Sequence, residues 1–150
     1  PVEVFEYPQN RFVAEFVGVT NFFDGKFIGK ENDSYSIKLD SGEIIKSNIA
    51  PTMKDGTRVT VGIRPQKIAL STAEFAEDNT ANKFSCIFQE TIYEGTLVRL
   101  LCHLSGQSSL EAQCMPDSLD FPYTSLKSGE KLTVRIPPDS VLVYPLSPKT

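Results

Sequence analysis

The sequence contains two copies of one short pattern, and this repeat constrains the fold more than any other feature. The stretch TVGIRPQKIAL at 60–70 returns as TVRIPPDSVLV at 133–143, an offset of 73 residues. At that offset apolar residues match apolar residues, and Pro65 matches Pro138. Since proline cannot donate to a strand ladder, each copy is predicted to be a strand that ends or bends at its proline. The repeat therefore predicts two related β-units, packed as two linked small barrels or as one pseudo-symmetric body.

Alternation of apolar and polar residues predicts several further strands with one buried face. The alternating segments are 35–39, 59–63, 98–104, 110–114 and 132–136. Glycine-containing turn sequences separate them at 40–42, 54–56, 104–107 and 127–129. Short strands at this spacing are typical of a sandwich or a small barrel, so we expect a mainly β protein of one of these two kinds.

The first twenty residues have a different period. Apolar residues spaced four apart in NRFVAEFVG predict a short helix at 10–17, with Asn10 capping its start. Gly18 suits the left-handed residue that ends a helix. We therefore predict that 21–71 is the first β-unit, 72–83 a linker and 84–150 the second β-unit. The family resemblance given below implies that 1–20 is the end of a preceding domain. The second unit carries an insert at 115–126, predicted to be loop with a turn of helix.

Composition excludes several classes of protein. The net charge of −4 and the pI near 5.0 argue against a nucleic-acid partner, because phosphate neutralisation supplies much of that affinity. Three cysteines without a CxxC pair argue against a disulfide framework and favour a reducing compartment. No apolar run approaches the roughly 18 residues of a membrane span, and no signal peptide is visible. Because the chain begins at Pro1 rather than Met, we expect it to be a piece of a longer protein.

Residues suited to catalysis or metal binding are few. His103 is the single histidine, and on a strand it points away from its neighbour Cys102, so the two cannot bind one metal. No phosphate loop, GxSxG or HExxH motif is present. We expect no catalytic residue, no cofactor and no metal in this chain. The stretch Tyr93–Glu94–Gly95 is interpreted either as a cation-binding tyrosine beside a carboxylate or as the end of a hairpin.

The N-terminal stretch resembles a known junction. Bacterial ABC importer ATPases close their ATPase domain with P-x-E-[IV]-[YF]-x-x-P-x-N-x-F-V-A-x-F-[IV]-G, ahead of a C-terminal regulatory (TOBE, OB-like) domain. The matching residues here are Pro1, Glu3, Val4, Phe5, Pro8, Asn10, Phe12, Val13, Ala14, Phe16, Val17 and Gly18. Asn21 and Gly25 match the N-x-x-x-G that begins the first barrel strand of that family.

Two further motifs support the resemblance over the whole chain. Arg64 and Pro65 match the R-P-E motif of the regulatory domain, but Gln66 stands where the family has glutamate. If that glutamate forms a salt bridge in relatives, we expect a neutral hydrogen bond in its place here. The stretch from Tyr93 to Gly95 resembles the Y-x-G strand of polyamine- and iron-type members. The resemblance implies an OB-like region and places ATP, magnesium and catalysis on a parent ATPase outside these residues.

Three functions are compatible with these observations. The first is a regulatory module that stabilises a dimer of ATPase subunits in a polyamine (spermidine/putrescine) importer, at the inner face of the bacterial cell membrane. Its partners would be its own ATPase domain, a second copy of the subunit and the membrane permease. The proposed contacts are Arg64, Pro65, Gln66, Tyr93, Glu94 and Gly95. The second is a ligand-sensing domain of a sugar, iron or sulfate importer ATPase. The third is an OB-type nucleic-acid-binding module, which the negative charge disfavours.

Overall fold

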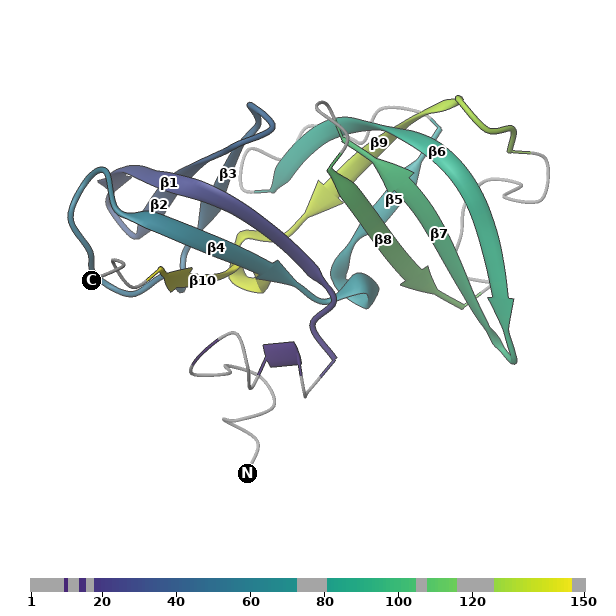
Figure 1. Ribbon diagram of the computed structural model, residues 1–150, viewed down its shortest axis with the longest axis horizontal. Helices are drawn as coiled ribbons and strands as arrows, with labels where there is room; N and C mark the ends of the chain where they lie inside the picture. The colour runs from purple at the N-terminus through teal and green to yellow at the C-terminus, as the bar shows by residue number, and fades with distance from the viewer. Residues whose placement is uncertain are drawn as a thin grey trace. The chain divides into compact units, whose positions relative to one another are not determined.

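The chain folds into two units, each built around its own five-stranded antiparallel sheet (Figure 1). The structure, a computed structural model, describes residues 10, 14–15, 18–72, 81–104, 108–115 and 126–146. Unit 1 comprises Pro1–Arg64 and Pro138–Thr150, and unit 2 comprises Pro65–Pro137. The mainly β fold predicted from the alternating segments is confirmed.

The sheet of unit 1 has the strand order β10-β4-β1-β2-β3. Its strands are β1 (Asn21–Glu31), β2 (Ser34–Leu39), β3 (Ile44–Ser47), β4 (Arg58–Ile63) and β10 (Leu142–Pro145). A short 3-10 turn, η5 (Pro138–Ser140), leads into β10 and packs against β3. The two edge strands of the sheet are thereby bridged, which gives this unit its barrel-like form.

The sheet of unit 2 repeats this plan in the order β5-β9-β6-β7-β8. Its strands are β5 (Ala69–Ser71), β6 (Asn82–Glu94), β7 (Leu97–His103), β8 (Ser109–Cys114) and β9 (Lys131–Ile136). The turn η1 (Pro65–Lys67) leads into β5 and packs against β8. Each proline-led turn therefore follows a six-residue strand of one sheet, β4 or β9, and packs against an edge strand of the other sheet.

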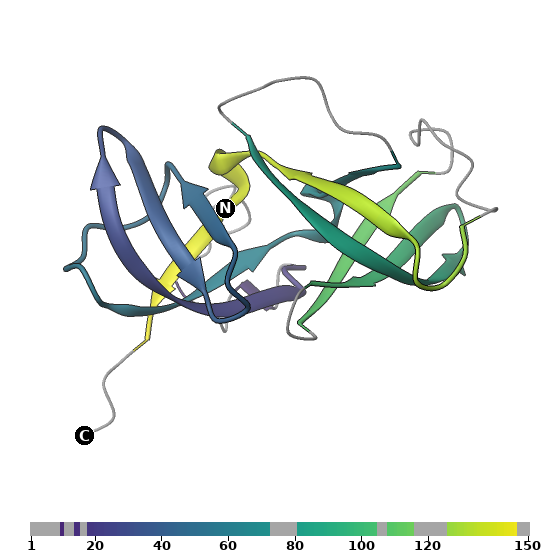
Figure 2. The ribbon, with the colours of Figure 1, turned by 90° about the horizontal axis from the view of Figure 1, so that it is seen from above.

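The two sequence repeats exchange their last strands. Leu70 of β5 lies opposite Val134 of β9, and Val143 of β10 lies opposite Val61 of β4. In Figure 2 the yellow end of the chain accordingly runs among the blue strands of the first sheet. The predicted boundaries, 21–71 and 84–150, follow the sequence repeats, whereas the structure divides the chain at 64/65 and 137/138. Each sheet is therefore completed by a strand that the other repeat supplies.

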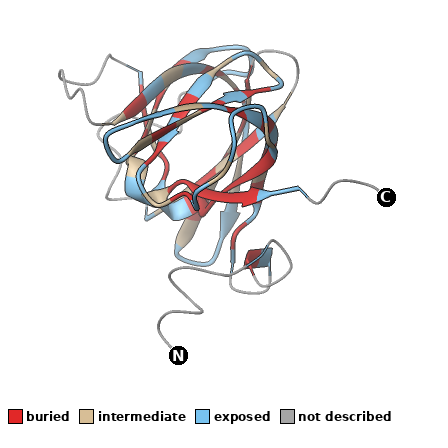
Figure 3. Cartoon of the chain, turned by 90° about the vertical axis from the view of Figure 1, so that its left-hand side faces the viewer, coloured by how far each residue is buried: buried red, intermediate tan, exposed pale blue. Residues whose placement is uncertain are grey.

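The core of each unit is made by the inward residues of alternating strands (Figure 3). Along β9 the residues alternate between buried and half-buried, with Leu132, Val134 and Ile136 no more than 1% exposed. The three predicted inward positions of β2 and of β4 are likewise buried. At about 25 cal/mol per Å² of apolar surface removed from water, such side chains provide most of the stabilising free energy.

Several glycines that the sequence places in turns or at the end of the N-terminal helix have a positive φ. Gly42, Gly56 and Gly129 all have positive φ, between 90° and 106°, as their turns require. Gly18 also has a positive φ of 97°, and its amide and that of Val19 donate to the carbonyl oxygens of Glu15 and Ala14. These two bonds form the pattern with which helices commonly end.

Several predictions lie outside the described residues. Within the predicted helix at 10–17 only 10 and 14–15 are described; residues 14–15 are helical, and the amide of Ala14 donates to the carbonyl oxygen of Asn10 over 2.9 Å. Three further segments lie mostly outside the described residues: the insert at 115–126 with its expected helical turn, the linker at 72–83 and the turn at 104–107. No helix in the described ranges is long and apolar enough to cross a membrane.

Candidate functional site

The Arg-Pro-Gln motif lies at the start of η1, and its three side chains differ in exposure. Pro65 ends β4 because it has no N–H to donate, and the amide of Ile68 donates to its carbonyl oxygen over 3.3 Å. Arg64 is only 7% exposed and Pro65 is buried, whereas Gln66 is exposed. Of the three proposed contacts in this motif, only Gln66 presents its side chain to solvent.

Arg64 is electrostatically coupled to Tyr144, a buried residue of β10 in the same unit. Burial raises the pKa of the Tyr144 hydroxyl to about 12, and the positive charge of Arg64 opposes part of that rise. Tyr144 is 9% exposed and belongs to a small apolar cluster with Ala14, Val19 and Leu142. Arg64 is therefore buried within this chain.

The Tyr93–Glu94–Gly95 stretch forms the end of the β6–β7 hairpin. Gly95 has a φ of 59°, which a tight turn between the two strands requires. Tyr93 is 59% exposed, one of the most exposed large apolar side chains in the described residues. A carboxylate oxygen of Glu94 accepts a 2.6 Å hydrogen bond from Arg99, which also pairs with Glu111. The hairpin interpretation is confirmed, and the carboxylate beside Tyr93 is already paired with a cation.

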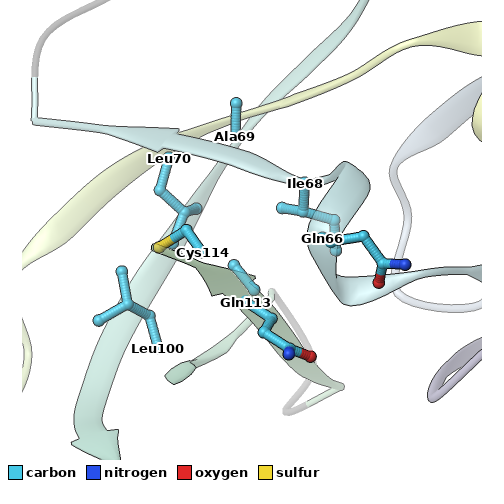
Figure 4. Close-up of a pocket in the computed structure, with 8 residues that line it drawn as sticks. Gln66, Ile68, Ala69, Leu70, Leu100, Gln113 and Cys114 are labelled. Carbon is cyan, nitrogen blue, oxygen red and sulfur yellow. The ribbon is translucent and has the colours of Figure 1, made fainter. Parts of the chain in front are cut away.

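A pocket of about 190 Å³ opens in unit 2, beside Gln66 (Figure 4). Residues of η1 and β5 form one wall, and residues of β7 and β8 form the other. Half of the lining residues are apolar and buried: Ile68, Leu70, Leu100 and Ala112. Gln66, Gln113 and Cys114 supply the polar atoms, and none of the described residues that line the pocket is charged. Figure 4 shows the two glutamine amides on one side and Leu70, Leu100 and the Cys114 sulfur on the other.

The structure places the predicted residues in two groups. Gln66 lines the pocket, and the hairpin stretch does not. Tyr93 lies opposite Val98, which in turn lies opposite Cys114, so these three residues share one face of the sheet. At about 4.8 Å per strand, Tyr93 lies roughly 10 Å from Cys114 across the sheet. The exposed tyrosine thus stands on the same face as the pocket, two strands away.

Sequence reasoning missed Gln113 and Cys114 as pocket residues. The alternation along 110–114 predicts Cys114 on an inward face as a small apolar side chain, and it is instead half-buried at the pocket. Nothing in the local sequence of β8 distinguishes these two residues. The signal that would have found them is the register of β7 against β8, which brings Leu100 opposite Ala112.

The remaining candidate residues are structural. His103 is half-buried and Cys102 is buried, as expected for neighbours on opposite faces of a strand. A hydrogen bond with the Cys102 thiol, together with burial, raises the pKa of the Cys86 thiol, so this group stays protonated. Within the described ranges no group of three or more His, Cys, Asp or Glu side chains is arranged to hold a metal ion.

Curated relatives of this chain include import ATP-binding proteins. It is 37% identical over 114 residues to the spermidine/putrescine import ATP-binding protein PotA of Fusobacterium nucleatum, covering 74% of this chain and 30% of that protein. It is 31% identical over 140 residues to PotA of Ruegeria pomeroyi and to the maltose/maltodextrin import ATP-binding protein MalK of Vibrio cholerae, in each case covering 91% of this chain and 35% of the relative. The chain therefore spans about a third of the length of these relatives.

A solved structure and a family model agree on the fold and the family. The molybdate-bound structure of the cytoplasmic molybdate-binding protein ModG superposes with a TM-score of 0.72 at 15% identity, covering 85% of this chain and 97% of that one. At that identity the likeness shows the fold, which is OB-like as predicted. The family model described as the TOBE domain matches residues 61–143, more than half of the chain and including both sequence repeats. The chain belongs to the TOBE domain family.

Proposed function

We propose that this chain is the C-terminal regulatory domain of the ATP-binding subunit of an ABC importer. The observation that carries the proposal is the TOBE family match over 61–143, combined with relatives that are import ATP-binding proteins about three times longer. In this proposal the parent protein hydrolyses ATP with magnesium upstream of these residues, at the inner face of the cell membrane. The domain itself contributes no catalytic group.

We propose polyamines as the transported substrates. PotA, whose name specifies spermidine and putrescine import, is the most frequent relative of this chain. The net charge of −4 is compatible with a cationic solute near this domain. A sugar importer is the alternative, because MalK of Vibrio cholerae matches as much of the chain as the PotA of Ruegeria pomeroyi.

We further propose that the domain stabilises a dimer of the parent subunit. Tyr93, Glu94 and Gly95 at the hairpin end and Gln66 on η1 are the exposed members of the predicted contact set. Exposed tyrosine is favoured at protein interfaces because it buries a large apolar ring and keeps a polar group. The burial of Arg64 and Pro65 removes them from this set, because a buried side chain does not meet a partner without rearrangement.

The first experiment tests the parent class. The coding sequence upstream of residue 1 is determined, and the full protein is assayed for ATP hydrolysis with and without its permease. An in-frame ATPase domain with a phosphate loop is the expected result. A coding sequence without one would overturn the proposal, whatever the behaviour of the isolated domain.

The second experiment tests the dimer contact in the full protein. Tyr93→Ala is compared with Ile44→Ala, which truncates another exposed apolar side chain, 55% exposed, on β3 of unit 1. Sedimentation velocity over a concentration series should show weaker self-association for Tyr93→Ala, by tenfold or more for an interface anchor, and no change for Ile44→Ala. Equal self-association of both variants and the wild type would show that the hairpin end is not the contact.

A further inference from the structure

The two units have equivalent positions that can be assigned from register alone. Asn21 lies opposite Ile63 in unit 1, and Asn82 lies opposite Ile136 in unit 2. The long strands β1 and β6 also carry a bulge at the same place, between Phe27 and Gly29 in β1 and between Phe88 and Glu90 in β6. The equivalence extends into the neighbouring strands, because Phe27 lies opposite Ile37 and Phe88 lies opposite Cys102.

Backbone hydrogen bonds confirm the equivalence. Phe27 and Phe88 each donate to a turn residue, Thr57 and Glu130 respectively, over 2.9 and 2.8 Å. Their carbonyl oxygens each accept a 2.8 Å bond from Gly56 or Gly129. From this alignment the pair Tyr35 and Ser47 in unit 1 corresponds to the pair Leu100 and Ala112 in unit 2, and each pair lies directly opposite across its strands.

In unit 1 this pair closes the gap between the two sheet edges. The Ser47 hydroxyl donates a 2.7 Å bond to the carbonyl oxygen of Val141 and accepts one of 3.2 Å from the amide of Ile49. The Tyr35 ring is 8% exposed and lies 5.8 Å from the ring of Phe27, centroid to centroid. The Ser47 hydroxyl thus joins β3 to the segment that follows η5, while the Tyr35 ring packs on Phe27.

In unit 2 the same pair leaves the gap open. Leu100 lacks the ring of Tyr35, and Ala112 lacks the hydroxyl of Ser47, so neither makes the bridge to Ile68, the counterpart of Val141. Leu100, Ala112 and Ile68 instead line the 190 Å³ pocket. The pocket is therefore lined by the two positions that in unit 1 hold Tyr35 and Ser47.

We propose that this pocket binds a small uncharged ligand with an apolar body and one hydrogen-bonding group. An engineered apolar cavity of about 150 Å³ holds a benzene ring. The pocket of about 190 Å³ is larger, so it has room for a single ring or a short branched chain. The buried aliphatic floor provides apolar contact. Gln66 and Gln113 are the amide side chains that line the pocket, and at its edge they can donate and accept hydrogen bonds (Figure 4).

The absence of charge among the pocket's lining residues defines the ligand class. A polyamine ammonium group or an oxyanion would meet no opposite charge among the described residues that line the pocket. The ligand of this pocket is therefore chemically distinct from the polyamines proposed as transported solutes, and the inference does not depend on the proposed function.

The test uses phenol, which has one ring and one hydroxyl, and the 150-residue chain labelled with ¹⁵N. Titration to 10 mM should give saturable shifts of the side-chain amides of Gln66 and Gln113 and the backbone amide of Cys114, with a Kd on the order of 1 mM. Spermidine and sulfate at the same concentrations should leave these signals in place. Wild-type chain without saturable shifts, or equal shifts with spermidine, would overturn the proposal.

Two variants make the assignment specific. Leu100→Tyr introduces the ring of unit 1 and should weaken phenol binding at least tenfold, whereas the matched change in unit 1, Tyr35→Leu, should leave it unchanged. Ala112→Val fills the pocket with less strain and should also weaken binding, which covers the case in which Leu100→Tyr does not fold. Binding as tight as wild type in both folded pocket variants would show that phenol binds elsewhere.

Discussion

The hydroxyl of Ser47 bonds to the carbonyl oxygen of Val141, a residue 94 positions later, over 2.7 Å. Ser47 is fully buried at the end of β3, and Val141 lies just before β10. The neighbouring amide of Asn48 donates to the carbonyl oxygen of Pro138 over 3.2 Å. These bonds join the edge strand of the unit 1 sheet to the segment that supplies its opposite edge.

Replacing Ser47 by alanine should destabilise the chain by about 1–3 kcal/mol, because a buried carbonyl oxygen loses a donor and the Ile49 amide loses an acceptor. Urea unfolding followed by circular dichroism measures the change. Ser128→Ala, at an exposed turn position, is the control and should change stability by less than about 0.5 kcal/mol. Equal effects of the two substitutions would contradict the role assigned to the Ser47 bond.

Gly25 should not tolerate alanine. A Cβ atom at this position would lie 2.6 Å from the carbonyl oxygen of Lys38 and 3.1 Å from the Cα of Leu39, both on the paired strand β2. The backbone of β1 or of β2 must shift, so we expect the free energy of unfolding to fall by at least about 1–3 kcal/mol. A Cβ atom at Gly29 on the same strand would meet no atom within 4 Å, so Gly29→Ala is the matched control in the same unfolding assay. A similar tolerance at both glycines would show that β1 and β2 lie further apart than the structure places them.

The sequence predicts strands best where period and turn chemistry agree. The segments around 59–63 and 132–136 alternate regularly, follow a glycine with positive φ and end at a proline, and both are strands. The first strand, β1, is indicated only by its resemblance to a family motif, and the thirteen-residue β6 is recognisable only at its hairpin end. Each contains a bulge that interrupts regular alternation, which weakens the signal of period two.

Which strand completes which sheet was not predictable from the repeat. Leu70 and Val143 are both apolar and both face an apolar partner, so the residues fit either sheet equally well. The pocket was missed for a related reason. It depends on the side chains at two equivalent cross-strand pairs, and these pairs are recognisable only when the register is known.

The exchange of strands should be visible in native-state hydrogen exchange. Val143→Ala removes a buried contact from the unit 1 sheet, so amide protection should fall in β4 more than in β9. Leu70→Ala is the matched change in the unit 2 sheet and should show the opposite pattern. Either truncation should lower the free energy of unfolding by about 1–4 kcal/mol. Loss of protection in β9 on changing Val143, with β4 unaffected, would show that each repeat keeps its own last strand.

Tyr144 should make the chain lose stability at alkaline pH. Its pKa is raised to about 12 by burial, whereas the unfolded chain has the ordinary value near 10. Between these pH values the folded state retains a proton that the unfolded state releases. The contribution of Tyr144 to the free energy of unfolding is therefore complete below pH 10 and disappears as the pH rises toward 12. By pH 11 the loss relative to pH 8 should be about 1 kcal/mol.

The measurement compares urea unfolding of the wild type and of Tyr144→Phe at pH 8, 10 and 11. The phenylalanine variant keeps the apolar ring within the cluster of Ala14, Val19 and Leu142 and removes the ionisable hydroxyl. The difference in stability between the two proteins should therefore shift in favour of Tyr144→Phe as the pH rises, while contributions from other titrating groups cancel. A difference that stays constant from pH 8 to 11 would mean that the Tyr144 hydroxyl ionises as easily in the folded chain as in the unfolded one, and that this end of β10 is open to water.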